Sequence, residues 1–312
     1  YDQSKQLDAK NKELLELNED LRRKSDAFFR YVPQDYLRLL GFEDDFDQVE
    51  LGMGVDRDLG ILFADIRKFT PLCEGMSPSE CVDFINSYVH HIENPISTNG
   101  GFIHDFLGDG VLALFNQGAS PAVRAGVGMM RMIGEFSAQR KKAGQREINI
   151  GVGVNAGHVT LGTIGSTTRM NCGVAGDPVN LASRVESLTK SYGCSMLISH
   201  HVVERLEKPD EFTLRQVDRV LVVGRTQPVN LYEVVDAESP EIADDKRATL
   251  ALYNEGIERY YAAEFIEAGR LFAESLARNP RDQNALTYLA RCRKHMEGVP
   301  DDWSGVELLG HK

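Results

Sequence analysis

The sequence has 312 residues, of which 42% are hydrophobic, and a formal net charge of -12 at pH 7. This apolar content excludes wholesale disorder, and the length allows one large core with an appendage or two domains. The acidic balance argues against a general nucleic-acid surface, which needs clustered Lys and Arg, so an anionic substrate would require a local device such as metal ions.

Cysteine usage and hydropathy favour a cytoplasmic, reducing setting. The five cysteines are odd in number and show no CxxC spacing, which predicts neither a disulfide framework nor a zinc site. No apolar run reaches the roughly 18 residues that span a bilayer, and no signal peptide is visible. Because the chain begins at Tyr1, we expect a fragment without its upstream part, compatible with the cytoplasmic part of a membrane-anchored sensor.

Residues 1–30 carry a heptad pattern. Apolar side chains recur every seven residues, and polar ones follow four positions after the first three: Leu7, Leu14, Leu21 and Phe28, then Asn11, Asn18 and Ser25. Buried Asn in such a seam fixes register and favours a parallel dimer, so we predict a parallel coiled coil. A single amphipathic helix packed on the domain is the alternative. Pro33 ends this helix, and residues 31–50 are predicted to be a connector.

Residues 51–237 mix strands and helices without a simple βαβ repeat, which predicts an α+β fold with one mainly antiparallel sheet. The helix that begins after Ser77 is expected to end near Pro95 with Val82 among its inward residues. The predicted elements are strands at 58–65, 148–154, 196–199, 217–223 and 231–235, a hairpin at 101–115, a glycine-rich turn at 157–165, and helices at 78–95, 119–142 and 177–192.

Residues 244–298 show helical periodicity, and residues 299–312 form a tail. Four residues fall at the spacing of a tetratricopeptide repeat: Gly256, Ala268, Phe272 and Pro280. Arg259 stands where that repeat expects an aromatic residue, so an ordinary helical hairpin is equally compatible. A further helix is predicted at 283–297. One repeat and a helix are too little for a free solenoid, so the helices at 244–298 must bury a face on the catalytic domain, on a dimer mate or on a partner.

Two carboxylates are candidate metal ligands. Asp65 ends a predicted strand, and Asp109 lies in the Gly-Asp-Gly turn of the hairpin at 101–115. Alone, Asp109 reads as a turn former. If the two strands are neighbours, the carboxylates converge, and two Asp without His or Cys are typical of Mg²⁺ in nucleotide chemistry. No Walker A or GxGxxG spacing is present, so backbone N–H groups of the loop at 66–70 are the candidate phosphate donors.

Three motifs in order identify a family resemblance: LFADIRKFT around Asp65, LGDGVLALF around Asp109, and GDPVNLASR, which contains Asn180 and Arg184 four residues apart on one helical face. Over roughly residues 49–236 the chain resembles the class III adenylate and guanylate cyclases. The resemblance implies a ferredoxin-like, mainly antiparallel sheet and a homodimer with composite sites at its interface. The preceding coiled coil fits this family, in which it links an upstream sensor to the cyclase dimer.

The resemblance also implies site roles. Asp65, Asp109 and the backbone carbonyl of Ile66 would bind two Mg²⁺ or Mn²⁺ ions, one lowering the pKa of the ribose 3′-hydroxyl and the other holding the triphosphate. Asn180 would orient the ribose, and Arg184 of the partner subunit would stabilise charge at the α-phosphate. Phosphate would be bound by Phe69, Thr70 and Arg225.

Three positions depart from the family pattern. Asp105 stands where adenylate cyclases carry Lys and guanylate cyclases carry Glu, which favours guanine chemically. Gly173, the second base-selecting position, has no side chain, and Val223 replaces a phosphate-binding Lys, for which Arg225 is the candidate substitute. Base rates in the family favour ATP. The sequence therefore predicts a purine nucleotide cyclase in signal transduction, with a slight lean to ATP and GTP as the alternative. A weakly active, nucleotide-binding signalling domain and a dimerising scaffold are the competing interpretations.

Overall fold

The computed structural model describes residues 2–29, 31–42, 49–166, 168–221, 227–296, 298 and 303–308. The chain divides into two compact units. The first comprises Tyr1–Val55 and Leu161–Val174, and the second comprises Asp56–Thr160 and Ala175–Lys312.

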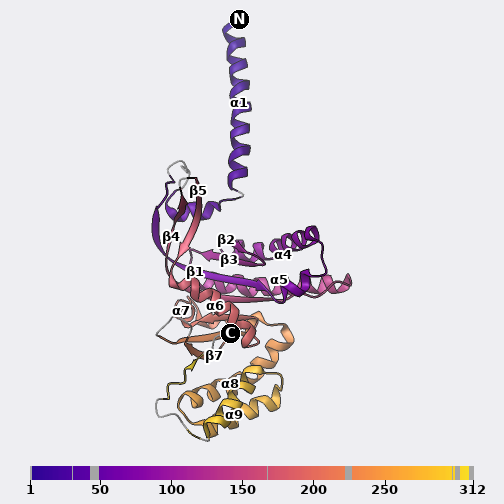
Figure 1. The fold of residues 1–312 in the computed structure, drawn as a ribbon, viewed down its shortest axis with the longest axis vertical. Coiled ribbons are helices and arrows are strands. Elements are labelled where there is room, and N and C mark those ends of the chain that lie inside the picture. Colours follow the sequence, from indigo (N-terminus) through magenta and orange to yellow (C-terminus); the bar gives the residue numbers. More distant parts are fainter. Residues whose placement is uncertain are drawn as a thin grey trace. The chain divides into compact units, whose positions relative to one another are not determined.

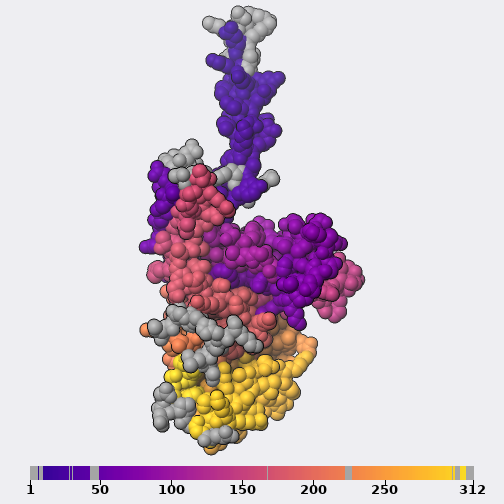
Figure 2. Space-filling model, viewed as in Figure 1, coloured from indigo at the N-terminus to yellow at the C-terminus, as the bar shows by residue number. Residues whose placement is uncertain are grey.

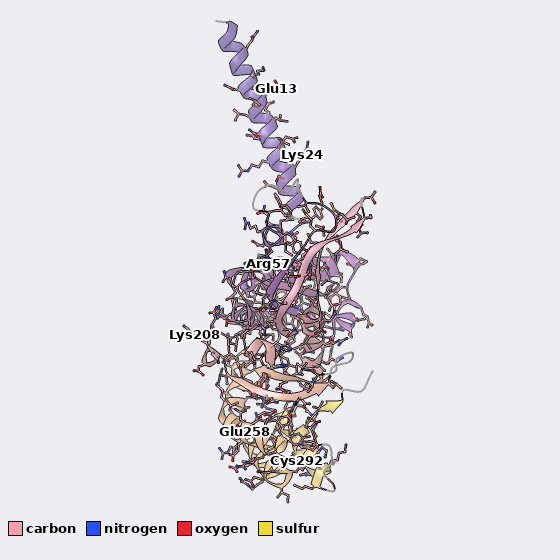
Figure 3. The ribbon with its side chains drawn as sticks, turned by 90° about the vertical axis from the view of Figure 1, so that its left-hand side faces the viewer. Glu13, Lys24, Arg57, Lys208, Glu258 and Cys292 are labelled. Carbon is pink, nitrogen blue, oxygen red and sulfur yellow. The ribbon has the colours of Figure 1, made fainter. Side chains whose placement is uncertain are left out.

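The first unit begins with helix α1 (Asp2–Phe29), followed by α2 (Gln34–Leu40). Figure 3 labels two charged residues of α1, Glu13 and Lys24. Two leucines of its apolar row are exposed in the single chain, where 56% of the surface of Leu14 and 55% of that of Leu21 is accessible. A solitary helix with exposed leucines is marginal in water, which supports the predicted coiled coil; the dimer stays a prediction.

The sheet has nine strands among the described residues, in the order β2-β3-β1-β4-β6-β8-β7-β9, with β5 paired to β4. The pairs β1–β3, β2–β3, β6–β8 and β7–β8 are antiparallel, whereas β4–β6 and β7–β9 are parallel. The predicted α+β class with a mostly antiparallel sheet is therefore confirmed. The strands are β1 (Gly54–Ile66), β2 (Gly101–Leu107), β3 (Gly110–Phe115), β4 (Ile150–Ser166), β5 (Arg169–Ala175), β6 (Met196–Ser199), β7 (Leu214–Leu221), β8 (Val229–Val234) and β9 (Glu307–Leu308).

The helices of the second unit pack on this sheet and on one another. In Figure 1, α4 lies beside α5, and α8 beside α9. None of the described helices is long and apolar enough to cross a membrane. The α-helices are α3 (Phe69–Cys73), α4 (Pro78–Thr98), α5 (Ala119–Lys142), α6 (Asp177–Ser191), α7 (His200–Val203), α8 (Pro240–Tyr261), α9 (Phe265–Arg278) and α10 (Gln283–Met296); η2 (Pro209–Glu211) and η3 (Val235–Ala237) are short 3-10 turns.

Helix α4 begins as predicted but differs from its prediction in where it ends and in which face is buried. Its start is as expected, because Ser77 and Glu80 form a reciprocal capping box. It does not end near Pro95 but runs to Thr98, with Pro95 buried in its last turn. The Thr98 hydroxyl donates to the Asn94 carbonyl at 2.7 Å. The inward face is also turned, since Val82 is 56% exposed.

The predicted glycine-rich turn at 157–165 is wrong, because these residues lie inside β4. From His158 to Thr163 the exposed and less exposed side chains alternate, as in a strand. The glycines permit close approach instead of turning the chain. A Cβ at Gly157 would lie 2.9 Å from the Pro178 ring, so glycine lets α6 begin directly against β4.

The C-terminal helices belong to the same compact unit as most of the sheet. They begin at Pro240, four residues before the predicted start. A buried aromatic cluster holds them together, in which the Tyr253 and Phe272 rings meet edge to face at 5.7 Å. Figure 2 shows their surface in orange and yellow at the C-terminal end of this unit.

Candidate active site

The end of β1 and the β2–β3 turn bring the two predicted carboxylates together. Antiparallel pairing sets Ala64 opposite Val111, one residue before Asp65 and two after Asp109. A Cβ at Gly110 would lie 3.2 Å from the Ala64 carbonyl oxygen and 3.4 Å from Asp65 Oδ1, so the hairpin turn passes close to the end of β1. The condition for their convergence is therefore met, because β1 and the hairpin strand β3 are neighbours in the sheet.

The two carboxylates are electrostatically coupled. Burial, followed by the hydrogen bond and the negative charge of Asp65 beside it, raises the pKa of Asp109 to about 6. The Ile66 N–H partly offsets this by donating to Asp109, and it also donates to Asp65 Oδ1 at 3.0 Å. Two half-buried carboxylates that repel each other at one point form a donor set that suits a hard divalent cation.

No cluster of three or more His, Cys, Asp or Glu side chains arranged for a metal occurs in the described part of the chain. Two carboxylates are enough for Mg²⁺, which keeps several waters and completes its octahedron with substrate phosphates. The residues at this corner therefore fit the metal ions that the resemblance implies.

Sequence reasoning missed a third carboxylate at this corner. Glu186 lies on α6, and burial followed by the charge of Asp65 raises its pKa to about 7. A Cβ at Gly151 would lie 2.7 Å from Glu186 Oε1 and 2.8 Å from Arg67 Nη2. The glycine on β4 thus makes room for both side chains. The only signal for this contact in the sequence was the pair of glycines, Gly151 and Gly153, within one predicted strand.

Helix α6 carries the predicted ribose and phosphate residues in its first turns. Asn180 is exposed and Arg184 half-buried, and both lie on the same face by their spacing. A contact from β4 holds the start of this helix, because buried Asn155 donates through Nδ2 to the Pro178 carbonyl at 2.9 Å. Ser199 donates in turn to Asn155 Oδ1 at 2.6 Å.

The loop after β1 contains an unusual backbone conformation. Lys68 has φ 55°, which is rare for a residue with a side chain. It directly precedes Phe69 and Thr70, which open the short helix α3. The Phe69 ring stacks on Phe84 at 6.4 Å, whereas Thr70 is exposed. The strained residue therefore sets the path of the predicted phosphate loop.

The predicted base-selecting positions fall in different units. Asp105, in the second unit, is exposed next to a bulge in β2, and its Oδ1 accepts the Phe106 N–H at 2.9 Å. Gly173, in the first unit, lies on β5, where its carbonyl is 2.6 Å from the hydroxyl of fully buried Tyr36. Arg225 and Val223 lie outside the described residues.

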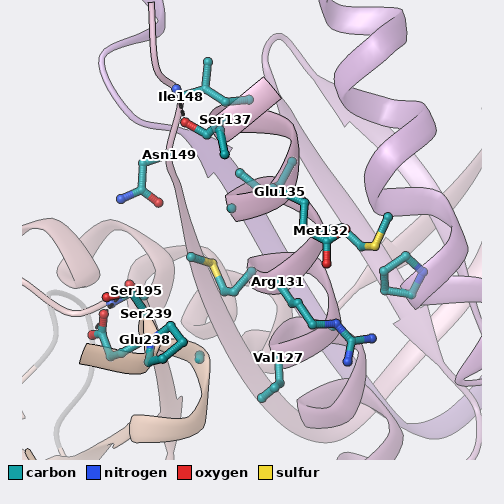
Figure 4. Close-up of a pocket in the computed structure, with 18 of the residues that line it drawn as sticks. Val127, Arg131, Met132, Glu135, Ser137, Ile148, Asn149, Ser195, Glu238 and Ser239 are labelled. Carbon is teal, nitrogen blue, oxygen red and sulfur yellow. Dashed lines mark hydrogen bonds between the residues drawn. The ribbon is translucent and has the colours of Figure 1, made fainter. Parts of the chain in front are cut away.

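The described residues also form a large groove away from the two carboxylates. It has a volume of about 1320 Å³ and lies between α5 and the segment around Ser195 and Glu238 (Figure 4). Its lining includes Arg131 and Asn149 but neither Asp65 nor Asp109. The corner with the paired carboxylates is the better candidate site on chemical grounds.

Comparison with known proteins bears on this corner. Residues 54–235 match the family model of the adenylate and guanylate cyclase catalytic domain. An adenylate cyclase of Anabaena cylindrica is 37% identical over 220 residues, covering 69% of this chain and 44% of the relative. A terminal-differentiation-specific adenylate cyclase of Dictyostelium discoideum is 33% identical over 274 residues, covering 86% of this chain and 13% of the relative. The chain thus spans less than half the length of these curated relatives.

Solved structures give the same answer. The guanylyl cyclase Cya2 matches with a TM-score of 0.51 and 32% identity over 60% of this chain and 96% of its own. The adenylyl cyclase CyaB from P. aeruginosa matches with a TM-score of 0.50 and 30% identity, covering 58% of this chain and 95% of that one. The chain therefore belongs to the family of adenylate and guanylate cyclase catalytic domains.

Proposed function

We propose that this chain is a purine nucleotide cyclase that converts ATP to the 3′,5′-cyclic monophosphate and pyrophosphate in signal transduction. The observation that carries the proposal is the meeting of Asp65 and Asp109 at one corner, with the pKa of Asp109 raised to about 6. The family motif that contains Asn180 and Arg184 accompanies this corner in the sequence.

In the proposed reaction the ribose 3′-oxygen attacks the α-phosphorus, and pyrophosphate leaves in line. Two Mg²⁺ or Mn²⁺ ions, held by Asp65, Asp109 and the Ile66 carbonyl, would lower the pKa of the 3′-hydroxyl and neutralise the triphosphate. Asn180 orients the ribose through its amide, and Arg184 donates to the α-phosphate oxygens as negative charge develops there. Backbone N–H groups of Phe69 and Thr70, with the Arg225 guanidinium, bind the remaining phosphates.

The site is proposed to be composite, formed by two copies of the chain. One subunit supplies the paired Asp, and its partner supplies Asn180 and Arg184. Apolar side chains beside the metal corner support this arrangement, since Phe106 is 55% and Leu107 50% exposed in the single chain. The exposed leucines of α1 provide a second surface for the same dimer, and in this proposal α1 links an upstream sensor to the catalytic domain.

ATP is the proposed substrate because the two curated relatives described above are named adenylate cyclases. A specific residue favours GTP as the second candidate. Asp105 places a carboxylate where a guanine would offer donors, and this side chain is exposed and available. Gly173 offers no side chain to either base. A weakly active nucleotide-binding domain is the remaining alternative.

One assay tests the proposal. Purified chain is incubated with Mg²⁺ or Mn²⁺ and either ATP or GTP, and cyclic product is measured beside Asp65→Ala and Asp109→Ala. We expect product that either substitution reduces by at least about 100-fold. Absence of product from both nucleotides would contradict the proposed activity, and product that survives both substitutions would contradict the metal assignment. Asp83→Ala, at an exposed residue of α4, serves as the matched control for removing a carboxylate that has no assigned role in the site.

A further inference from the structure

The family match ends at residue 235, yet buried charged side chains inside it also pair with charged residues beyond that point. Arg215 of β7 and Glu233 of β8 lie directly opposite each other on the two strands. The exposed fraction is 1% for Arg215 and 0% for Glu233. Arg215 Nε donates to Glu233 Oε2 at 2.5 Å. The rest of the guanidinium donates to Asp282, just before α10, at 2.5 and 3.1 Å.

The second oxygen of Glu233 accepts a hydrogen bond from Lys246 of α8. Burial alone would raise the pKa of Glu233, but Arg215 and Lys246 hold it well below its usual range. Lys246 also donates to Glu238 at 3.0 Å, and Glu238 accepts from the Ser195 N–H at 3.0 Å. The C-terminal helices therefore complete a buried charge network of the catalytic sheet. Removing them would leave charges buried without partners.

A second buried carboxylate connects these helices to α6. Asp218 of β7 is fully buried. Its Oδ2 accepts from the Tyr192 hydroxyl at 2.7 Å and from Arg291 Nη2 of α10 at 2.8 Å. Tyr192 is the residue at which α6 ends. One carboxylate thus holds the end of α6 and the middle of α10 together.

The contact continues beyond this carboxylate. Asn284, in the first turn of α10, donates to the Sγ of buried Cys194 at 3.4 Å. The backbone carbonyl of Cys194 accepts a hydrogen bond from Nη2 of Arg67 at 3.2 Å, and Arg67 lies two residues after Asp65. The segment that follows α6 therefore contacts α10 on one side and Arg67, in the loop after β1, on the other.

We infer that α8–α10 are an integral part of the catalytic unit, and that Asp218 and Arg291 are positioning residues that fix α6. This inference rests on the proposed function, because α6 carries Asn180 and Arg184. A rigid helix anchored at its end directs the residues at its start, so loosening the Asp218 anchor misaligns the ribose and phosphate contacts. The two residues act through α6 and touch no substrate.

The test uses the full chain with Arg291→Met, Arg291→Lys, Asp218→Asn and the double variant Asp218→Asn/Arg291→Met. Arg293→Met, an exposed arginine on the same helix, is the matched control. We expect Arg291→Met to lower kcat per folded molecule about tenfold with a smaller change in KM, and Arg291→Lys to restore part of it. The double variant should recover thermal stability, because no lone charge is buried, but should not recover kcat.

A second readout does not depend on activity. Amide hydrogen exchange over residues 181–190 should be faster in Arg291→Met than in the Arg293→Met control. Unchanged kcat per folded molecule together with unchanged exchange in α6 would overturn the positioning role. If the wild-type chain makes no cyclic product, the proposed function fails, and the exchange comparison alone still decides whether Arg291 anchors α6.

Discussion

Arg67 donates through Nη2 to the hydroxyl of Thr189 at 2.5 Å and so ties the loop after β1 to α6. Burial lowers the pKa of this guanidinium, and the negative charges of Glu186 and Asp65 oppose that shift. Arg67 thus lies between the corner that contains Asp65 and the helix that carries Asn180. In the proposed homodimer these two parts serve different composite sites, so Arg67 connects one site with the other.

Replacing Arg67 is expected to affect catalysis more than folding. We predict that Arg67→Met lowers kcat by roughly 10- to 100-fold, because the loop after Asp65 loses its connection to α6. Thr189→Val, which keeps the shape and removes one acceptor, should cause a smaller loss. Steady-state kinetics of the purified variants measures both. Full activity of Arg67→Met would show that the loop is positioned without this side chain.

The raised pKa of Glu186 predicts a pH dependence of stability. Its value of about 7 lies above the ordinary 4.5 because of burial and of Asp65. A carboxyl whose pKa is raised on folding favours the folded state when it is protonated. Its contribution to stability is fully present below about pH 4.5 and is lost as the pH rises through about 7. In metal-free protein, Glu186→Gln should match the wild type near pH 4.5 and exceed its Tm by roughly 2–4 °C at pH 8.

Thermal unfolding in EDTA between pH 4.5 and 8 measures this difference. Glu93→Gln, which removes an exposed carboxylate on α4, is the control and should show no pH-dependent gap. A constant gap across the whole range would contradict the assignment of a raised pKa to Glu186.

Tyr36 connects α2 to β4 and β5 in the first unit. Its hydroxyl accepts the Gly162 N–H at 2.8 Å and lies within hydrogen-bond distance of the Gly162 and Gly173 carbonyls. We predict that Tyr36→Phe destabilises the fold by about 1–3 kcal/mol, because the half-buried Gly162 N–H loses its acceptor. Urea unfolding measures the loss. Tyr31→Phe, at a residue that is 89% exposed, should change stability by no more than about 0.5 kcal/mol.

Base preference is expected to respond to a designed triple variant. Asp105→Lys introduces a donor for adenine, and Gly173→Thr introduces a side chain at the second position. A Cβ at Gly173 would lie 2.3 Å from Ile164 Cδ1, so Ile164→Ala is added to make room. The ratio of kcat/KM for ATP to that for GTP should rise about tenfold relative to Ile164→Ala alone. An unchanged ratio would mean that the base is recognised elsewhere.

The sequence predicted the parts of this protein that depend on local patterns. The Ser77 cap, the hairpin with Asp109 at its turn and the helix at 119–142 are all found where periodicity and capping chemistry place them. Even the convergence of Asp65 and Asp109 followed from one assumption, that their strands are neighbours. The roles of the site residues stay predictions.

What the sequence did not reveal depends on tertiary contact. Gly157 looked like part of a turn because its reason for being glycine, the nearby Pro178 ring, lies 21 positions away along the chain. Glu186 and Arg67 pack against each other only because Gly151, on a different strand, has no side chain to separate them. The role of Asp218 was invisible for the same reason, since its partners Tyr192 and Arg291 come from distant helices.

Complementation of two inactive variants tests the composite site most directly. Asp65→Ala and Asn180→Ala are co-expressed with different tags, and cyclic product is compared with each variant alone and with the wild type. Random pairing makes half of the dimers mixed, and each mixed dimer has one intact site, so activity should return to about one quarter of the wild-type value. An active wild type whose two variants show no recovery, although mixed dimers are isolated through both tags, would contradict the composite site.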